Sequence, residues 1–290
     1  MWDQLSASEL AGVAGIGLLA GTLGGMLGVG GSVLMIPGLT WLFGPAQHLY
    51  QAAAMIANVA VSIPAALRHR RAGAIVFPLL KWMLPAALVC VLLGVAASNL
   101  PWFAGSDGGR WLGRVLAVFL IYVAVVNALR LRHDPPLRGH HPESDGATTE
   151  DSTEGDNTDL THATPARTTV VGGVMGGIAG LLGIGGGALA VPLQQTLLHL
   201  PLRNAIANSS AVICVSAAVG AVYKNATLAQ HAGPDQALTW TSGLALAALL
   251  APTAWIGGRL GAKLTHTLPL RLVRGAFVLL MLGAAWRMAI

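Results

Sequence analysis

The stretch GGMLGVGGS at residues 24–32, followed by Pro37, is echoed 155 residues later by AGLLGIGGG at residues 179–187, followed by Pro192. Glycine is costly inside a helix, so each glycine run predicts a break within an otherwise apolar segment. One offset relates both the glycine runs and the prolines. This regularity predicts that the chain contains two copies of one unit.

The composition excludes an ordinary soluble domain. The chain is 54% hydrophobic and 10% charged, whereas a typical soluble domain has about 25% charged residues. Besides the two broken segments, at 10–43 and 170–198, six apolar stretches are long enough to cross a hydrocarbon core, which takes about 20 helical residues. These are residues 49–67, 75–98, 111–129, 204–223, 238–258 and 269–288. We therefore expect an all-α integral membrane protein.

A polar segment separates the two units. Residues 133–166 hold eight of the twelve Asp and Glu residues, and such a segment cannot bury enough apolar surface to offset its ordering entropy. The predicted organisation is an N-terminal transmembrane repeat at 1–132, an acidic flexible cytoplasmic linker at 133–166 and a C-terminal transmembrane repeat at 167–290. The linker histidines lack a scaffold and the two cysteines are isolated, so we expect no metal and no cofactor.

Two topologies are compatible with these segments. If the first segment of each unit spans the membrane, the 17 Lys and Arg residues divide ten to seven between the two sides. If it is a re-entrant hairpin, each unit makes three crossings, the second copy is inverted, and the division becomes thirteen to four. Basic residues favour the cytoplasmic side, so we expect the inverted arrangement, with both termini outside. Each flank of a break, about 10–14 residues, then measures close to half a membrane.

The breaks are the candidate substrate site, because non-helical backbone persists at membrane depth only where protein or water satisfies its polar groups. The helices that restart at Ser32 and Gly187 would present N–H groups and positive dipole ends to an anion. Tight helix packing is the alternative use of small residues spaced four apart, such as Gly172, Gly176 and Gly180, and we expect it for Gly257 and Gly261. The predicted substrate-binding residues are Gly28, Gly30, Gly31, Ser32, Asn58, Gly183, Gly185, Gly186, Gly187, Asn208, Ser209 and Ser210.

Two basic residues occupy matched positions in the two units. Arg71 and Lys224 are 153 residues apart and lie at opposite membrane faces in the inverted topology. They are candidate gating residues for anions, or interfacial anchors whose charged ends reach the membrane surface. No Asp or Glu lies within a predicted span, which argues against a cation site. The basic excess of the body has a topological explanation and does not indicate nucleic-acid binding.

The doubled break, at residues 24–37 and 179–192, and the segments 52–58 and 205–211 that follow it resemble the sulfite exporter TauE/SafE family of membrane proteins. The resemblance extends over nearly the whole chain apart from the linker. It implies a multi-pass permease of the bacterial cytoplasmic membrane that moves sulfite, sulfonates such as sulfoacetate, or related small anions, usually outward. The long acidic linker departs from this pattern.

The sequence therefore predicts a permease that exports small anions by alternating access around the broken helices. Its expected partners are the anion, the lipid bilayer and, as an open possibility, further copies of the chain. The alternative is a non-transporting membrane scaffold or assembly protein whose acidic linker binds a partner. An intramembrane enzyme is disfavoured because the spans lack an acid–base pair, and we expect no catalytic residue.

Overall fold

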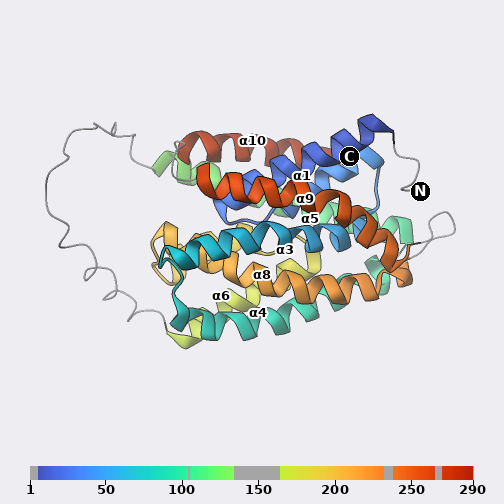
Figure 1. Cartoon of the computed structure of the whole chain (residues 1–290). Helices are drawn as coiled ribbons and strands as arrows, with labels where there is room; N and C mark the ends of the chain where they lie inside the picture. The colour runs from blue at the N-terminus through green and yellow to red at the C-terminus, as the bar shows by residue number, and fades with distance from the viewer. Residues whose placement is uncertain (1–5, 104, 134–163, 232–237, 265–269, 290) are drawn as a thin grey trace, which may run out of the picture.

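The structure is a computed structural model in which residues 6–103, 105–133, 164–231, 238–264 and 270–289 are described. All regular elements within these ranges are helices (Figure 1). In chain order they are α1 Ala7–Leu27, α2 Ser32–Phe43, α3 Gln47–Arg71, α4 Phe77–Ser98, η2 Pro101–Phe103, α5 Gly105–His133, α6 Pro165–Leu182, α7 Gly187–Leu197, α8 Leu202–Ala226, η4 Leu228–His231, α9 Trp240–Leu264 and α10 Leu270–Ala289. Nearly all of the predicted linker, residues 134–163, lies outside the described residues.

The described helices have the length and surface of membrane spans. Six are long and apolar enough to cross a membrane: α1, α3, α4, the part Gly108–Leu129 of α5, α8 and α9. Their outward faces are also apolar, with Val222 on α8 73% exposed and Leu279 on α10 72% exposed. A surface that exposes large apolar side chains on several helices fits a hydrocarbon environment better than water. The prediction of an all-helical membrane protein is confirmed.

Both predicted breaks are present. The last turn of α1 is capped by Gly28 at φ +65°, and that of α6 by Gly183 at φ +72°. Glycine adopts this left-handed conformation without the steric penalty of a Cβ atom, which is why it commonly ends helices. The breaks fall later than expected, so α1 has 21 residues and α6 has 18. The prediction that each first flank measures half a membrane was therefore wrong.

At each break the chain folds back on itself. A Cβ atom built on Gly12 would lie 3.0 Å from Leu42, and one on Gly38 would lie 3.1 Å from Ile16. This reversed pairing shows that α2 runs antiparallel to the first part of α1. In the second unit, Val171 near the start of α6 and Leu198 just after α7 belong to one apolar cluster, so that pair of helices also returns to the end from which it starts.

Each hairpin packs on a helix of the other unit through glycine. A Cβ atom on Gly25 of α1 would lie 2.7 Å from the carbonyl oxygen of Gly258 on α9, and one on Gly21 would overlap the carbonyl of Ala254. In the same way, Gly172, Gly176 and Gly180 of α6 face the carbonyl groups of Met83, Ala87 and Val91 on α4. Gly257 and Gly261 of α9 likewise face the carbonyl groups of Leu18 and Thr22 on α1. The packing role predicted for these two glycines is confirmed, because only a residue without a side chain permits so close an approach.

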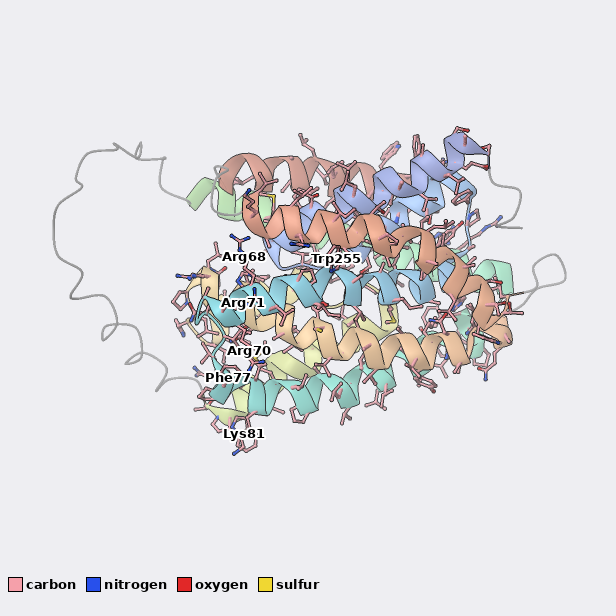
Figure 2. The ribbon with its side chains drawn as sticks, in the orientation of Figure 1. Arg68, Arg70, Arg71, Phe77, Lys81 and Trp255 are labelled. Atoms are coloured by element: carbon pink, nitrogen blue, oxygen red, sulfur yellow. The ribbon has the colours of Figure 1, made fainter. Side chains whose placement is uncertain are left out.

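The bundle has two chemically different ends. We call the basic end the one where α3 ends and α4 begins, marked by Arg68, Arg70, Arg71 and Lys81 (Figure 2). Arg203 at the start of α8 donates to the carbonyl of Ala72 there, at 3.3 Å. We call the lysine end the opposite one, where the last turn of α8 carries Lys224.

Candidate functional site

The two breaks meet inside the bundle. A Cβ atom on Gly187 would lie 2.5 Å from the carbonyl oxygen of Gly28, and one on Gly30 would lie 3.5 Å from the carbonyl oxygen of Ile184. The structure thus brings the two predicted glycine sites into direct contact. We call this contact the break junction; it comprises Gly28, Gly30, Gly31, Ser32, Gly183, Gly185, Gly186 and Gly187, together with Asn58.

Asn58, in the middle of α3, contacts both breaks. Its Oδ1 atom accepts the N–H of Ser32 at 3.0 Å, and its Nδ2 atom donates to Ser32 Oγ at 2.6 Å. A Cβ atom on Gly30 would lie 3.3 Å from Asn58 Oδ1, and one on Gly185 would lie 2.7 Å from Asn58 Nδ2. Because glycine leaves room on both sides, one fully buried amide can contact both broken segments.

The two helix N-termini at the junction are not equivalent. Asn58 satisfies the first N–H of α2, so the expectation that Ser32 presents this donor to an anion was wrong for this conformation. The N-cap of α7 is Gly186, which provides no side-chain hydrogen bond. The start of α7 therefore keeps the N–H groups and partial positive charge that attract anions.

The other predicted polar residues, Asn208, Ser209 and Ser210, lie on α8 and have hydrogen-bond partners outside the break junction. Asn208 Oδ1 accepts the N–H of Val76, just before α4, at 2.9 Å. Gln194 Nε2 of α7 donates to Ser209 Oγ at 2.8 Å. Ser210 Oγ donates to the carbonyl of Ile206 at 2.9 Å, within α8. In this conformation the bonds of Asn208 and Ser209 join α8 to its neighbours, the bond of Ser210 lies within α8, and none of the three is to the break junction.

The two predicted gating residues occupy very different surroundings. Arg71 is exposed at the basic end, where it lines a cavity of about 380 Å³ with Arg68 and Arg259. Lys224 is completely buried. Its Nζ atom donates to His48 Nδ1 at 2.9 Å, to Ser98 Oγ at 2.8 Å and to Asn99 Oδ1 at 3.0 Å. The anchoring alternative was therefore wrong for Lys224, because its ammonium group does not reach the surface.

Two histidines complete this lysine cluster, which we define as Lys224, His48, Ser98, Asn99 and His231. The rings of His48 and His231 stack with centroids 3.7 Å apart. His48 Nε2 lies 2.8 Å from the carbonyl oxygen of Phe103, and His231 Nε2 lies 2.9 Å from Asn99 Oδ1. Burial, and then the nearby charge of Lys224, lower the pKa of His231 to about 4, so this ring is neutral at physiological pH.

The sequence analysis did not identify the partners of Lys224. His48 immediately precedes the predicted span at 49–67, and His231 follows the one at 204–223 by a few residues. An ionisable residue beside or within a span is a functional candidate, and this signal was available for both histidines. It could not show that they meet, because 182 residues separate them in the chain.

The apolar helices, their apolar outward faces and the broken hairpins define a multi-pass helical membrane protein. Within that class, the chain belongs to the sulfite exporter TauE/SafE family, whose model matches residues 13–288. No solved structure matches the chain.

Curated relatives have names that agree with this family. The chain is 29% identical, over 98% of its length, to the probable membrane transporter protein MamO of Magnetospirillum gryphiswaldense, and it covers 45% of that protein. It is 26% identical, over 87% of its length, to the probable membrane transporter protein YunE of Bacillus subtilis, and it covers 86% of that protein. The chain thus spans about half the length of MamO and most of YunE.

Proposed function

We propose that the protein is a permease that exports small anions, sulfite or sulfonates such as sulfoacetate, across a bacterial cytoplasmic membrane. One observation carries the proposal: breaks from both units meet at Asn58, eleven residues from one end of α3 and thirteen from the other. Broken helices that meet near mid-depth are the usual binding site of transporters built from inverted repeats. The uncapped start of α7 supplies N–H donors suited to an oxyanion.

The contacts of the hairpins support a re-entrant, inverted arrangement. The α1–α2 hairpin returns to the lysine end, where Gly44 lines a cavity with Arg110 and Arg287. The α6–α7 hairpin returns to the basic end, where Leu198 clusters with Val76. Alternating access then exposes the break junction first to one side and then to the other.

This arrangement fixes an orientation that can be measured. The positive-inside bias places the basic end in the cytoplasm, so α1 should start and α10 should end outside. Single cysteines at Ser6 and Ala289, in a chain whose two native cysteines are replaced by alanine, should react with a membrane-impermeant maleimide in intact cells or right-side-out vesicles. Protection of both positions, with labelling only after lysis, would contradict the orientation.

The transport proposal is tested by flux through the reconstituted full chain. Proteoliposomes loaded with radiolabelled sulfite or sulfoacetate should release it faster than empty liposomes. Gly30→Ala and Gly185→Ala force a Cβ atom into the left-handed region at φ +85° and +76°, next to Asn58. Such strain costs about 1–3 kcal/mol, so we expect flux per reconstituted protein to fall by about tenfold or more.

Matched controls exist on the same hairpins. Gly15 of α1 and Gly177 of α6 have no atom within 4 Å of an added Cβ atom, so Gly15→Ala and Gly177→Ala should leave flux unchanged. No wild-type release of any anion in a panel of sulfite, sulfonates and small carboxylates would reject the permease. Full flux in Gly30→Ala and Gly185→Ala would reject the break junction as its site.

A further inference from the structure

The ammonium group of Lys224 is buried among neutral acceptors. Its three donors are used by an imidazole nitrogen of His48, the hydroxyl of Ser98 and the amide oxygen of Asn99. Among the side chains that the structure describes, Glu9 is the one carboxylate, and it is exposed at the start of α1 and bonded to Ser6. A buried charge without a counter-ion is expensive, by several kcal/mol in real proteins. Among the described side chains no carboxylate compensates the charged form of the cluster, so a bound anion would stabilise it.

The groups that face Lys224 do not reduce this positive charge. The described ionisable neighbours are His48 from α3 and His231 from η4. The end of α4 contributes the neutral Ser98 and Asn99, and η2 contributes the carbonyl of Phe103. Next to His48, Gln47 lines a cavity of about 480 Å³. The cationic residues that line this cavity are Arg110, Arg114 and Arg287, so the described side chains around it favour an anion.

With Lys224 as an ammonium group, the hydrogen bonds assign the remaining protons. An ammonium group can only donate, so His48 accepts at Nδ1 and carries its own proton on Nε2, which donates to the carbonyl of Phe103. The amide oxygen of Asn99 can only accept, so His231 donates from Nε2. Its Nδ1 atom then bears a buried lone pair without a hydrogen-bond partner. The cluster thus holds one excess proton and has a second, vacant acceptor.

We propose that Lys224 and His48 form the proton-coupling site of this permease, and that the site retains its excess proton while the anion is bound and releases it when the anion leaves. The proposal rests on the proposed anion transport. In the transfer, an N–H bond of Lys224 breaks, its electron pair stays on Nζ, and the lone pair of His48 Nδ1 forms the new N–H bond. The His48 ring stays hydrogen-bonded at both nitrogens after it accepts the proton. When the anion leaves, an N–H bond of the ring breaks, its electron pair stays on the nitrogen, and the proton passes to a water molecule, which becomes hydronium.

The helix that carries His48 also links the cluster to the break junction. His48 and Asn58 are ten residues apart on α3, about 15 Å along a helix axis. At that distance, with an effective dielectric constant of about 20, the attraction between unit charges changes an affinity by roughly sixfold. By linkage, an anion at the junction raises the proton affinity of the cluster by the same factor.

The experiment follows protons and anions together in proteoliposomes of the full chain. Methanesulfonate and isethionate are the probes, because a sulfonate stays ionised at every pH used and brings no proton of its own. A trapped pH-sensitive dye reports proton movement. For the wild type we expect proton movement with the anion, and a half-saturating anion concentration that rises roughly sixfold as the cluster loses its proton.

Three variants separate the roles of charge and proton. Lys224→Arg keeps the charge but cannot release a proton, so we expect anion flux with a flat pH profile and without proton movement. His48→Gln keeps an acceptor for Lys224 and a donor for the carbonyl of Phe103, yet removes the ring that takes the proton. It should also lose proton movement, and it serves if Lys224→Arg fails to fold. His199→Gln, at an exposed histidine outside the cluster, should behave as the wild type.

The possible failures can be distinguished. Wild-type anion flux without protons would reject the coupling and leave the permease standing. No wild-type flux of either sulfonate, or of the panel used above, would reject the permease and the coupling with it. Proton movement that persists in Lys224→Arg and His48→Gln, but is lost in Asp107→Asn or Asp235→Asn, would assign the proton to a carboxylate whose side chain the structure does not describe.

Discussion

The two glycine breaks have matching sequences but are stabilised in different ways. The first restarts at Gly31, which has right-handed backbone angles (φ −75°), and Asn58 caps the helix that follows it. The second restarts at Gly186, which is left-handed (φ +70°) and gives α7 no side-chain cap. The repeat thus reproduces the interruption of the helix, while one asparagine from the first unit contacts both breaks.

The residues around the two hairpins also differ, because apolar side chains in the first unit are replaced by polar ones in the second. In the first unit, Leu39 of α2 and Ile56 of α3 belong to the apolar core. The matching positions in the second unit are Gln194 and Ser209, which hydrogen-bond to each other. The second unit therefore lines its hairpin with polar groups and leaves its helix N-terminus uncapped. We infer that the anion binds mainly to the second break, with Asn58 completing the site from the first unit.

The largest expected difference in the free energy of unfolding is between alanine variants of the two N-cap glycines, Gly186 and Gly31. Gly186→Ala would place a Cβ atom in the left-handed region and against the backbone carbonyl of Met175. Left-handed strain alone costs about 1–3 kcal/mol, and the carbonyl cannot move independently of its helix. We expect Gly186→Ala to lower the free energy of unfolding by about 3 kcal/mol or more, as measured by denaturant titration in detergent.

Gly31→Ala is the matched variant in the first break. Its backbone angles suit alanine, and the nearest atom to the new Cβ is the terminal methyl of Met35 at 2.8 Å, which can rotate away. We expect a loss of about 1 kcal/mol or less. Equal losses in the two variants would show that the breaks are mechanically equivalent and would remove the distinction drawn here.

The sequence predicted the features that depend on local backbone cost. Several glycines within a few residues make a helix costly, so the breaks before Ser32 and Gly187 were predictable without any knowledge of neighbouring helices. The exact position of each break was harder to predict from the sequence. Both α1 and α6 are apolar around their whole circumference, so no periodicity marks where either helix ends. The packing role of Gly257 and Gly261 in α9 was also predictable, because it follows from the small size of glycine alone.

The remaining features depend on which helices meet. Asn58 contacts Gly185, 127 positions away in the chain, and the amide group itself gives no sign of such a partner. Lys224 lies near the end of an apolar stretch, where most lysines extend to the membrane surface. Its burial follows from the convergence of α3, α4 and η4 around the end of α8, which is tertiary information.

A smaller difference in the free energy of unfolding is expected between alanine variants of Asn58 and Asn208, the two asparagines predicted to bind substrate. Asn58→Ala leaves the buried N–H of Ser32 unsatisfied and removes the donor to its hydroxyl. A buried group left without its partner costs about 1–3 kcal/mol, so we expect a loss near 2 kcal/mol. Asn208→Ala breaks one bond, from the N–H of Val76, and also removes a buried Nδ2 atom that has no partner. Its loss should be about 1 kcal/mol.

Flux measured on the same two variants decides which asparagine contacts the anion. Asn127→Ala is the control, since Asn127 bonds only within its own helix, to the carbonyl of Val123, and should change neither stability nor flux. If Asn58 completes the anion site, sulfoacetate flux per folded Asn58→Ala protein should fall severalfold, while folded Asn208→Ala should transport as the wild type. The reverse order would place the anion beside α8 and the start of α4, and would make the bond between Asn58 and Ser32 purely structural.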